Sequence, residues 1–180
     1  LESRGLGDVY KRQEMAAQGW TGILIPEQYG GSDFGLAGIG VVLEELGRTL
    51  TPSPLFATSV VCATLINKAG NNDQKEEYLK KIASGEITMS FALEEGPRHK
   101  PFSIDLEAKK DGDNFILNGK KNFVIDGGFS DYIIVAARTS DNEDQISLFI
   151  LDKNYDGLNI LPTVMVCLLY TSDAADDQLG

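Results

Sequence analysis

The spacing of apolar residues changes once along this chain of 180 residues, and that change most restricts how the chain can fold. Before Gly85, apolar residues recur every three or four positions, as they do along one face of an α-helix. After Gly85 they recur at every second position, as they do along one face of a β-strand. The sequence therefore predicts a helical part followed by a β part, with the boundary near Glu86.

The first of three expected helices carries an apolar stripe at three- and four-residue steps. Ser32 or Asp33 can cap its first turn, because a short polar side chain accepts a hydrogen bond from an otherwise unpaired amide. Gly47 suits its end. A stripe of this kind packs into a core more often than it lines a ligand cleft. Its residues are Leu36, Ile39, Leu43, Leu46 and Leu50.

Two further helices complete the expected helical part. One runs from Pro54 to Gly70, since proline is tolerated in the first turn of a helix. The other starts after Asn71 and closes near Gly85. Gln74 stands three residues after Asn71, so the two side chains can form a variant of the capping box.

Seven short segments after Gly85 alternate between apolar and polar residues and predict strands. The dipeptides Asp111-Gly112 and Asn118-Gly119 lie between them and suit the positive φ of tight hairpin turns. Short strands with frequent turns favour a small antiparallel β-barrel or sandwich. The predicted strands are Ile87–Glu94, Ile104–Lys110, Phe115–Leu117, Asn122–Ile125, Tyr132–Ala137, Ser147–Leu151 and Leu158–Leu161.

Four ranges follow for the whole chain. Residues 14–86 are expected to form the helical domain and residues 87–165 the β domain. Residues 1–13 and 166–180 fit neither apolar period, and both resemble translated sequencing-adapter sequence. We therefore interpret them as a non-native leader and a non-native tail, and exclude them from functional reasoning.

Composition excludes several classes of function. The net charge of −11 argues against nucleic-acid binding, which needs clustered Lys and Arg. No apolar run approaches the roughly 20 residues of a membrane span, and a cytoplasmic protein is expected. His99 is the one histidine, so no histidine-based metal site or Ser/His/Asp triad is predicted. Cys62 lies among apolar residues and is expected to be buried rather than a nucleophile.

Five phrases of the sequence resemble the acyl-CoA dehydrogenase family in residue pattern and spacing, and the resemblance as a whole extends over essentially all of residues 14–165. The resemblance implies an α+β fold in which a helical domain and a small β domain precede a C-terminal helical bundle, which we expect to be missing here. It also implies FAD as cofactor, held between the β domain and that bundle. The phrases are GWTGILIPEQYGG (19–31), VVLEELGRTL (41–50), QKEEYLKKIASGE (74–86), MSFALEE (89–95) and DGDNFILNGKKNFVIDGGFSDYIIVAART (111–139).

The same resemblance implies the chemistry. Members of this family desaturate an acyl-CoA thioester: a carboxylate removes the α proton while a hydride passes from the β carbon to flavin N5. The carboxylate base belongs to the C-terminal domain, so we expect no catalytic residue within this chain, and no activity from it alone. An acyl-CoA substrate, an electron-transfer flavoprotein as electron acceptor and a homo- or hetero-oligomer are the implied partners.

The resemblance identifies two segments that face the flavin. In the first, Glu94 stands where the family has threonine and Gly96 where it has proline. In the second, Phe123 keeps an aromatic wall, but Ile125 replaces a threonine hydroxyl that serves flavin N5. The candidate cofactor-binding residues are Phe91, Leu93, Glu94, Arg98, His99, Lys100, Phe123, Val124 and Ile125.

Three alternatives stay open at this stage. Arg98, His99 and Lys100 stand where the family has a G-S-D turn near the FAD pyrophosphate, and they either hold that anion by charge-assisted hydrogen bonds or form a solvated loop. The altered motifs also fit a non-catalytic partner subunit of a heteromeric acyl-CoA dehydrogenase. A flavin oxidase or monooxygenase of the same fold is the remaining reading.

Overall fold

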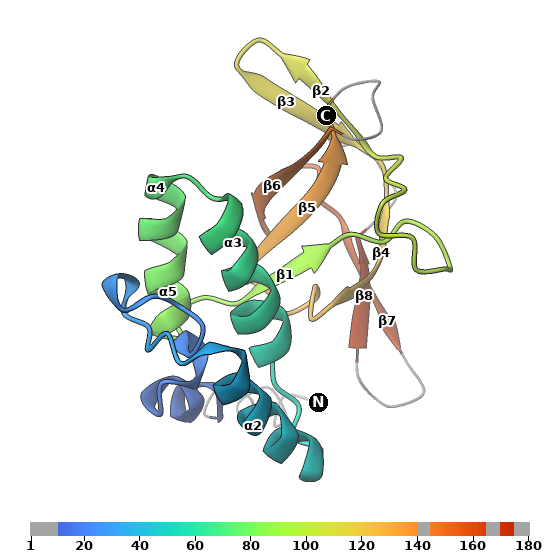
Figure 1. The fold of residues 1–180 in the computed structure, drawn as a ribbon. Helices are drawn as coiled ribbons and strands as arrows, with labels where there is room; N and C mark the ends of the chain where they lie inside the picture. Colours follow the sequence, from blue (N-terminus) through green and yellow to red (C-terminus); the bar gives the residue numbers. More distant parts are fainter. Residues whose placement is uncertain (1–10, 140–144, 165–169, 175–180) are drawn as a thin grey trace. The chain divides into compact units, whose positions relative to one another are not determined.

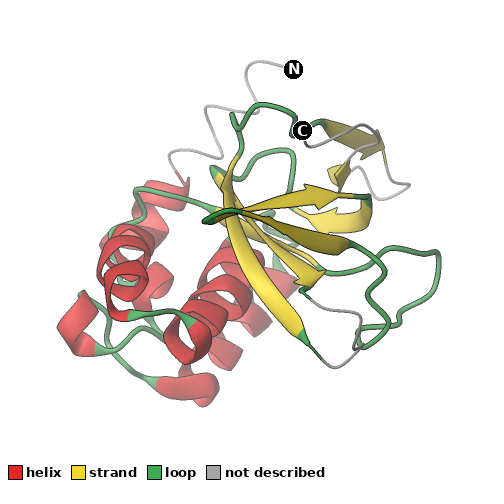
Figure 2. Ribbon diagram, turned by 90° about the horizontal axis from the view of Figure 1, so that it is seen from above, coloured by secondary structure: helices red, strands yellow, loops and turns green. Residues whose placement is uncertain are grey.

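The structure is a computed structural model that describes residues 11–139, 145–164 and 170–174. The chain divides into two compact units, Leu1–Thr88 and Met89–Gly180. Among the described residues, helices occur in the first unit and strands in the second (Figures 1 and 2). The expected order, helical part before β part, is confirmed.

The helical unit contains the three expected helices, two of which include a turn of π-helix. The second expected helix is η3 followed directly by α3, and the third is α4, η4 and α5 in continuous succession. The elements are a helix over residues 11–17, η1 Trp20–Gly22, η2 Glu27–Tyr29, α2 Gly35–Arg48, η3 Phe56–Cys62, α3 Ala63–Ala69, α4 Asn72–Gln74, η4 Lys75–Leu79 and α5 Lys80–Ala83.

The capping box before α4 is confirmed. The Asn71 side chain accepts a hydrogen bond from the Gln74 amide at 2.8 Å, and the Gln74 side chain accepts one from the Asn71 amide at 2.9 Å. Each side chain thus satisfies an amide that has no partner inside the helix. At the other end Gly85 adopts φ 71°, the left-handed conformation that commonly follows a helix.

The ends of α2 differ from the prediction. Neither Ser32 nor Asp33 caps this helix: its N-cap is Phe34, which makes no side-chain cap. The amides of Ser32 and Asp33 are hydrogen bonded to the carbonyls of residues 22 and 25. At the other end, the Thr49 hydroxyl donates to the carbonyl of Glu45 at 3.2 Å. The left-handed residue after the helix is then Leu50, with φ 47°, and not Gly47.

The apolar stripe of α2 is a core feature only in its middle. Ile39 is buried, whereas Leu36 and Leu50 at the two ends are 74% and 87% exposed. Ile39 packs in a cluster with Ile23 and Leu55. Leu43 and Leu46 are half-buried beside this cluster. The prediction of a core stripe therefore holds for three of its five residues.

Gly31 occupies a place in the helical unit where no side chain fits. A Cβ atom on Gly31 would stand 1.9 Å from the carbonyl oxygen of Ile25 and 2.5 Å from that of Gly22. The Gly31→Ala variant is therefore expected to lower the free energy of unfolding by about 2 kcal/mol, measured by urea denaturation. Gly40→Ala is the control, because Gly40 lies within α2 with open space around it. Equal stability of the two variants would contradict this account.

The described residues of the β unit form all seven predicted strands and one more. The hairpin between β2 and β3 turns at Gly112, which has φ 61°, with Asp111 opposite Asn114. The Asp111-Gly112 turn is therefore confirmed. The strands are β1 Met89–Ala92, β2 Glu107–Asp111, β3 Asn114–Asn118, β4 Lys121–Ile125, β5 Tyr132–Arg138, β6 Ile146–Asp152, β7 Ile160–Val164 and β8 Tyr170–Ala174.

These strands form two sheets, one of which is mixed. In the larger sheet β5 pairs with β1, β2 and β6, and β3 extends from β2. In the smaller sheet β8 lies between β4 and β7. β1 pairs with β5 in parallel, from Met89 opposite Tyr132 to Ala92 opposite Val135. The expectation of a wholly antiparallel β domain is corrected here: the chain between β1 and β5 is long enough to return β5 in the same direction.

The strand β8 lies within residues 166–180, where no element was expected. Its pairing with β7 and β4 uses backbone groups, which every residue type except proline supplies in full. Residues 11–13, inside the expected leader, are helical. The interpretation of both ends as non-native stays a prediction, and residues 1–10, 166–169 and 175–180 of these ranges lie outside the described residues.

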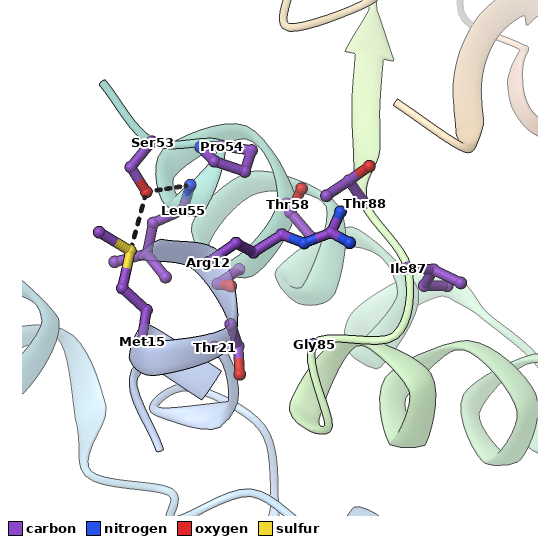
Figure 3. A pocket seen from close by; sticks show the side chains of 11 residues that line it. Arg12, Met15, Thr21, Ser53, Pro54, Leu55, Thr58, Gly85, Ile87 and Thr88 are labelled. Carbon is purple, nitrogen blue, oxygen red and sulfur yellow. Dashed lines mark hydrogen bonds between the residues drawn. The ribbon is translucent and has the colours of Figure 1, made fainter. Parts of the chain in front are cut away.

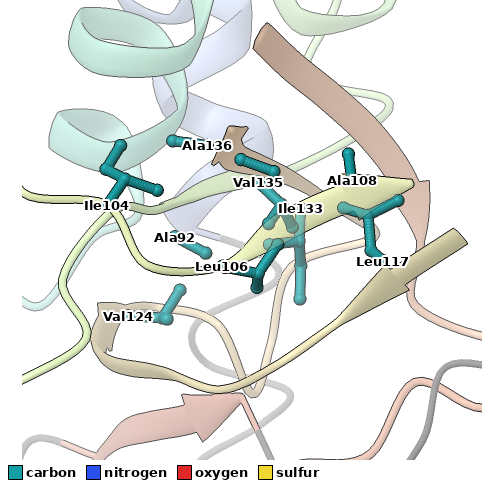
Figure 4. Close-up of a cluster of buried hydrophobic side chains, with 10 residues drawn as sticks. Ala92, Ile104, Leu106, Ala108, Leu117, Val124, Ile133, Val135 and Ala136 are labelled. Atoms are coloured by element: carbon teal, nitrogen blue, oxygen red, sulfur yellow. The ribbon is translucent and has the colours of Figure 1, made fainter. Parts of the chain in front are cut away.

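An apolar cluster lies at the centre of the described part of the β unit. Figure 4 shows its side chains converging from β1, β2, β3, β4 and β5. The apolar residues that predicted these strands thus supply the core, and β5 is buried at consecutive positions, on both of its faces. The buried members are Ala92, Ile104, Leu106, Ala108, Leu117, Val124, Ile133, Val135, Ala136 and Ala137.

Candidate functional site

The two segments expected to face the flavin lie side by side in the β unit. The first is the extended run that follows β1, and the second is β4. The Asn122 amide donates to the Glu94 carbonyl at 2.7 Å, and the Asn122 side chain donates to the Glu95 carbonyl at 2.7 Å. Lys121 Nζ donates to the Leu93 carbonyl at 3.1 Å. The first two residues of β4 therefore donate hydrogen bonds to all three backbone carbonyls of residues 93–95.

Lys121 and Glu95 form a buried ion pair beneath this junction. Their side chains are 2% and 13% exposed. The Glu95 carboxylate also accepts hydrogen bonds from the amides of Asp105 at 2.6 Å and Leu106 at 3.0 Å. Burial lowers the pKa of Lys121, and the hydrogen bond that its ammonium donates to Glu95 opposes that shift. Glu95 is therefore held by structural partners and is not a free acid.

Apolar side chains on the outer face of β4 make the exposed part of the candidate site. Phe123 and Ile125 are 52% and 50% exposed, whereas Val124 between them is buried in the core. Phe123 has φ 54°, a conformation that a bulky side chain adopts at an energetic cost. Such strain is concentrated at functional sites. Val124 can therefore contact a cofactor only through its backbone, while Phe123 and Ile125 present their side chains.

Phe91 and Leu93, the apolar candidates on the first segment, are half-buried and pack against the core of the β unit. Ala92 between them is fully buried. Much of each side chain is thus already used in packing. The outer apolar surface comes from β4 more than from the first segment.

Glu94 is turned into the loop that follows it. Its carboxylate forms a short hydrogen bond with Nδ1 of His99, and it accepts a second from the Lys100 amide at 3.1 Å. The Glu94 side chain is 18% exposed and that of His99 is 76% exposed. Arg98 and Lys100 are exposed. Within the described ranges their side chains form no hydrogen bond or ion pair, so they are available to an anion.

Sequence reasoning missed Asp126, which directly follows β4 beside the candidate site. It adopts φ 60°, and its carbonyl accepts hydrogen bonds from the amides of Phe129 at 3.0 Å and Ser130 at 3.1 Å. Burial raises the pKa of the Asp126 carboxyl to about 6. The residues Asp126-Gly127-Gly128 do mark a turn, but nothing in that pattern signals a half-buried carboxyl.

The remaining candidates have structural roles. A cavity of ≈ 10 Å³ in the helical unit is lined by Arg12, Thr58 and Thr88 among others (Figure 3). Its volume has room for about one water molecule and is far too small for a substrate. Cys62 is fully buried as expected, and burial raises its thiol pKa. In the part of the chain that the structure describes, no cluster of His, Cys, Asp and Glu suits a metal ion, and no helix is long and apolar enough to cross a bilayer.

Two family models match the chain. The model described as "Acyl-CoA dehydrogenase, N-terminal domain" matches residues 7–86, and the model described as "Acyl-CoA dehydrogenase, middle domain" matches residues 94–166. The first match begins inside the expected leader, and the two matches together cover most of both units.

Known proteins of this kind are similar along most of the chain. The 3-(aryl)acrylate reductase of Clostridium sporogenes is 34% identical over 152 residues, which are 82% of this chain and 40% of that protein. Mitochondrial isovaleryl-CoA dehydrogenase of Bos taurus is 36% identical over 141 residues, 77% of this chain and 33% of that protein. The solved butyryl-CoA dehydrogenase of Megasphaera elsdenii matches with TM-score 0.75 and 28% identity over 90% of this chain and 45% of its own. The chain thus spans less than half the length of each.

Proposed function

Because this chain belongs to the acyl-CoA dehydrogenase family of flavoprotein oxidoreductases, we propose that the full-length protein removes two hydrogens from the α and β carbons of an acyl-CoA thioester, with FAD as cofactor. The observation that carries this proposal is the junction of the two expected flavin-facing segments, where the Asn122 amide meets the Glu94 carbonyl at 2.7 Å. That junction creates one surface on which a ring system can rest. The names of two similar proteins, a dehydrogenase of an acyl-CoA and a reductase of an acrylate, both fit two-hydrogen transfer between adjacent carbons.

The residues present fit FAD in two respects. The exposed side chains of Phe123 and Ile125 offer an apolar surface for the flavin ring, and the exposed cations Arg98 and Lys100 suit a pyrophosphate. When bound, FAD supplies the flavin N5 that accepts the hydride. Ile125 has no hydroxyl to donate to N5, so hydrogen bonds at the ring come from backbone groups of the two segments.

The catalytic base belongs, in this proposal, to a part of the protein outside this chain. The carboxylates nearest the candidate site support that assignment, because Glu95 is paired with Lys121 and Glu94 with His99. A carboxylate held by such partners is poorly placed to accept a substrate proton. The 180-residue chain on its own is therefore expected to show no dehydrogenase activity, measured with acyl-CoA substrates and an artificial electron acceptor.

Substrate, acceptor and assembly belong to the same proposal. An acyl-CoA thioester donates the hydrogens, and an electron-transfer flavoprotein reoxidises the reduced flavin. The full-length protein acts in the cytoplasm as a homo- or hetero-oligomer.

A second candidate function is a non-catalytic partner subunit of a heteromeric acyl-CoA dehydrogenase. Two observations favour it: Ile125 lacks the hydroxyl expected at flavin N5, and Glu94 brings a carboxylate where the family has threonine. The two candidates differ in one measurable property, because a subunit without a functional flavin site binds no FAD.

FAD titration of the full-length protein tests both candidates. The double variant Arg98→Gln/Lys100→Gln is expected to bind FAD roughly tenfold more weakly at low salt, because two charge-assisted contacts to the pyrophosphate are lost. The difference should shrink at high salt, since counter-ions screen exposed charges. The matched control is Lys109→Gln/Lys110→Gln, which removes two exposed charges of β2 in the same unit.

The outcomes separate the candidates. If the unaltered full-length protein binds no FAD, the partner-subunit function is correct. If it binds FAD and the Arg98/Lys100 variant binds equally well, the basic residues belong to a solvated loop and the pyrophosphate is held elsewhere.

A further inference from the structure

Two consecutive carboxylates fasten the loop that joins the first flavin-facing segment to β2. Glu94 binds the first half of this loop, at His99 and the Lys100 amide. Glu95 binds its second half, at the amides of Asp105 and Leu106. Consecutive side chains of an extended backbone point to opposite sides, so each carboxylate reaches a different part of the loop.

The two carboxylates differ in what else they hold. Glu95 is paired with Lys121, which is 2% exposed, so it also supports the β unit itself. Both partners of Glu94 lie in the loop, and one of them, His99, is 76% exposed. Loss of the Glu94 charge should therefore release the loop without disturbing the core.

We infer that Glu94 is a positioning residue, whose carboxylate fixes residues 96–103 in the shape that presents Arg98 and Lys100 and does not direct its charge at the flavin. The part of this inference that concerns cofactor binding rests on the proposed function. A positioning role also explains how a carboxylate can stand at residue 94, where the family has threonine. A free carboxylate beside a flavin would oppose the gain of negative charge on reduction, whereas a carboxylate that two donors hold within a loop does so far less.

Limited digestion with trypsin tests the loop directly, in the full-length protein and without any cofactor. The bond after Arg98 is a tryptic site within the loop, while the bond after Lys100 is protected by Pro101. Glu94→Gln replaces one of the two acceptor oxygens of the carboxylate by an NH2 group, which donates hydrogen bonds and does not accept them. Cleavage after Arg98, followed by mass spectrometry, is expected to become about tenfold faster, because cleavage tracks the population of the open loop.

Glu107→Gln is the matched control, since Glu107 is a carboxylate of β2 whose ion pair with Lys109 is long at 3.8 Å. Its cleavage after Arg98 is expected to equal that of the unaltered protein. His99→Gln is the second variant, which keeps the bond between Glu94 and the Lys100 amide. It should show a smaller acceleration than Glu94→Gln, and it carries the test if Glu94→Gln fails to fold.

The tautomer of His99 gives a second readout, which a general loosening of the fold would not produce. An ionised carboxylate only accepts hydrogen bonds, so Nδ1 of neutral His99 must carry the proton that Glu94 receives. Imidazole ¹⁵N shifts of His99, assigned by their loss in His99→Gln, are expected to report the Nδ1–H form. In Glu94→Gln the Nε2–H form should gain population.

The results distinguish this inference from the proposed function. Unchanged cleavage after Arg98, or an unchanged His99 tautomer, in a folded Glu94→Gln variant overturns the inference alone. Absence of FAD binding in the unaltered protein overturns the proposed function and leaves both loop readouts interpretable. If FAD binds, its reduction potential is expected to be the same in Glu94→Gln, and a raised potential would mean that the charge does reach the flavin.

Discussion

Replacement of Glu95 by glutamine is expected to lower the free energy of unfolding by about 3–5 kcal/mol, the cost of breaking a buried ion pair on one side. The variant removes the charged partner of the Lys121 ammonium, which is 2% exposed and also donates a hydrogen bond to the Leu93 carbonyl. It also weakens the acceptor for the Asp105 and Leu106 amides. Urea denaturation followed by circular dichroism measures the loss.

The double variant Glu95→Gln/Lys121→Met separates the ion pair from general damage. Removing both charges leaves no unpaired buried ammonium, so the double variant should lose less stability than the sum of the two single variants. An additive result, or a loss under about 1 kcal/mol in Glu95→Gln, would contradict a structural role for this pair.

The features that could be predicted from the sequence are local ones. The capping box of Asn71 and Gln74 depends on a spacing of three residues, and the turn at Gly112 depends on a dipeptide. The change of apolar period depends on which face of each element is buried, and the spacing of apolar residues within each element shows that face. These predictions are confirmed because the interactions that cause them span few residues.

The parallel pairing of β1 with β5 could not be predicted in the same way. Met89 lies opposite Tyr132, and β2, β3 and β4 come between them in the chain. Apolar alternation fixes which side of a strand faces the core but not which strand lies next to it. The expectation of antiparallel pairing was wrong for β1 because it rested on the hairpin turns, which say nothing about more distant strands.

The sequence singled out the two segments of the candidate site but not the contacts that their side chains make. The two segments do lie together. If buried and exposed side chains alternated strictly along β4, the buried Val124 would imply a buried Asn122 and an exposed Lys121, whereas Lys121 is the buried residue. The register between β4 and β8 shifts between Lys121 and Val124, and Phe123 there has a positive φ. This irregularity turns Lys121 inward, and no residue of the run signals it beforehand.

The sequence also could not predict where the side chain of Glu94 points. A glutamate in place of threonine, in a segment that the family resemblance directs at the flavin, suggests a charge at the flavin. The sequence offers no reason to pair this glutamate with His99. That pairing depends on the course of the loop after Gly96, which brings His99 back to Glu94. A motif can therefore give the position of a site residue in the chain, while a loop outside that motif determines where the charge of its side chain points.

Replacement of Asp126 by asparagine is expected to stabilise the protein at pH 7 and to have little effect at pH 4. Burial raises the pKa of this carboxyl from 3.8 to about 6. Between these values the folded chain binds more protons than the unfolded chain, so the free energy of unfolding falls as the pH rises through that window. At about 1.4 kcal/mol for each pH unit, the penalty at pH 7 reaches up to about 3 kcal/mol.

Asparagine is suited to this position because it adopts the left-handed conformation, φ 60° here, about as readily as aspartate. The hydrogen bonds that the turn receives end on the backbone carbonyl of Asp126, so the variant keeps them. Asp113→Asn, at an exposed position in the β2–β3 turn, is the matched control and should change stability by less than about 0.5 kcal/mol at either pH. Urea denaturation of Asp126→Asn at pH 4 and pH 7 decides the matter: an equal gain at both would mean that burial of the charge is not its cause.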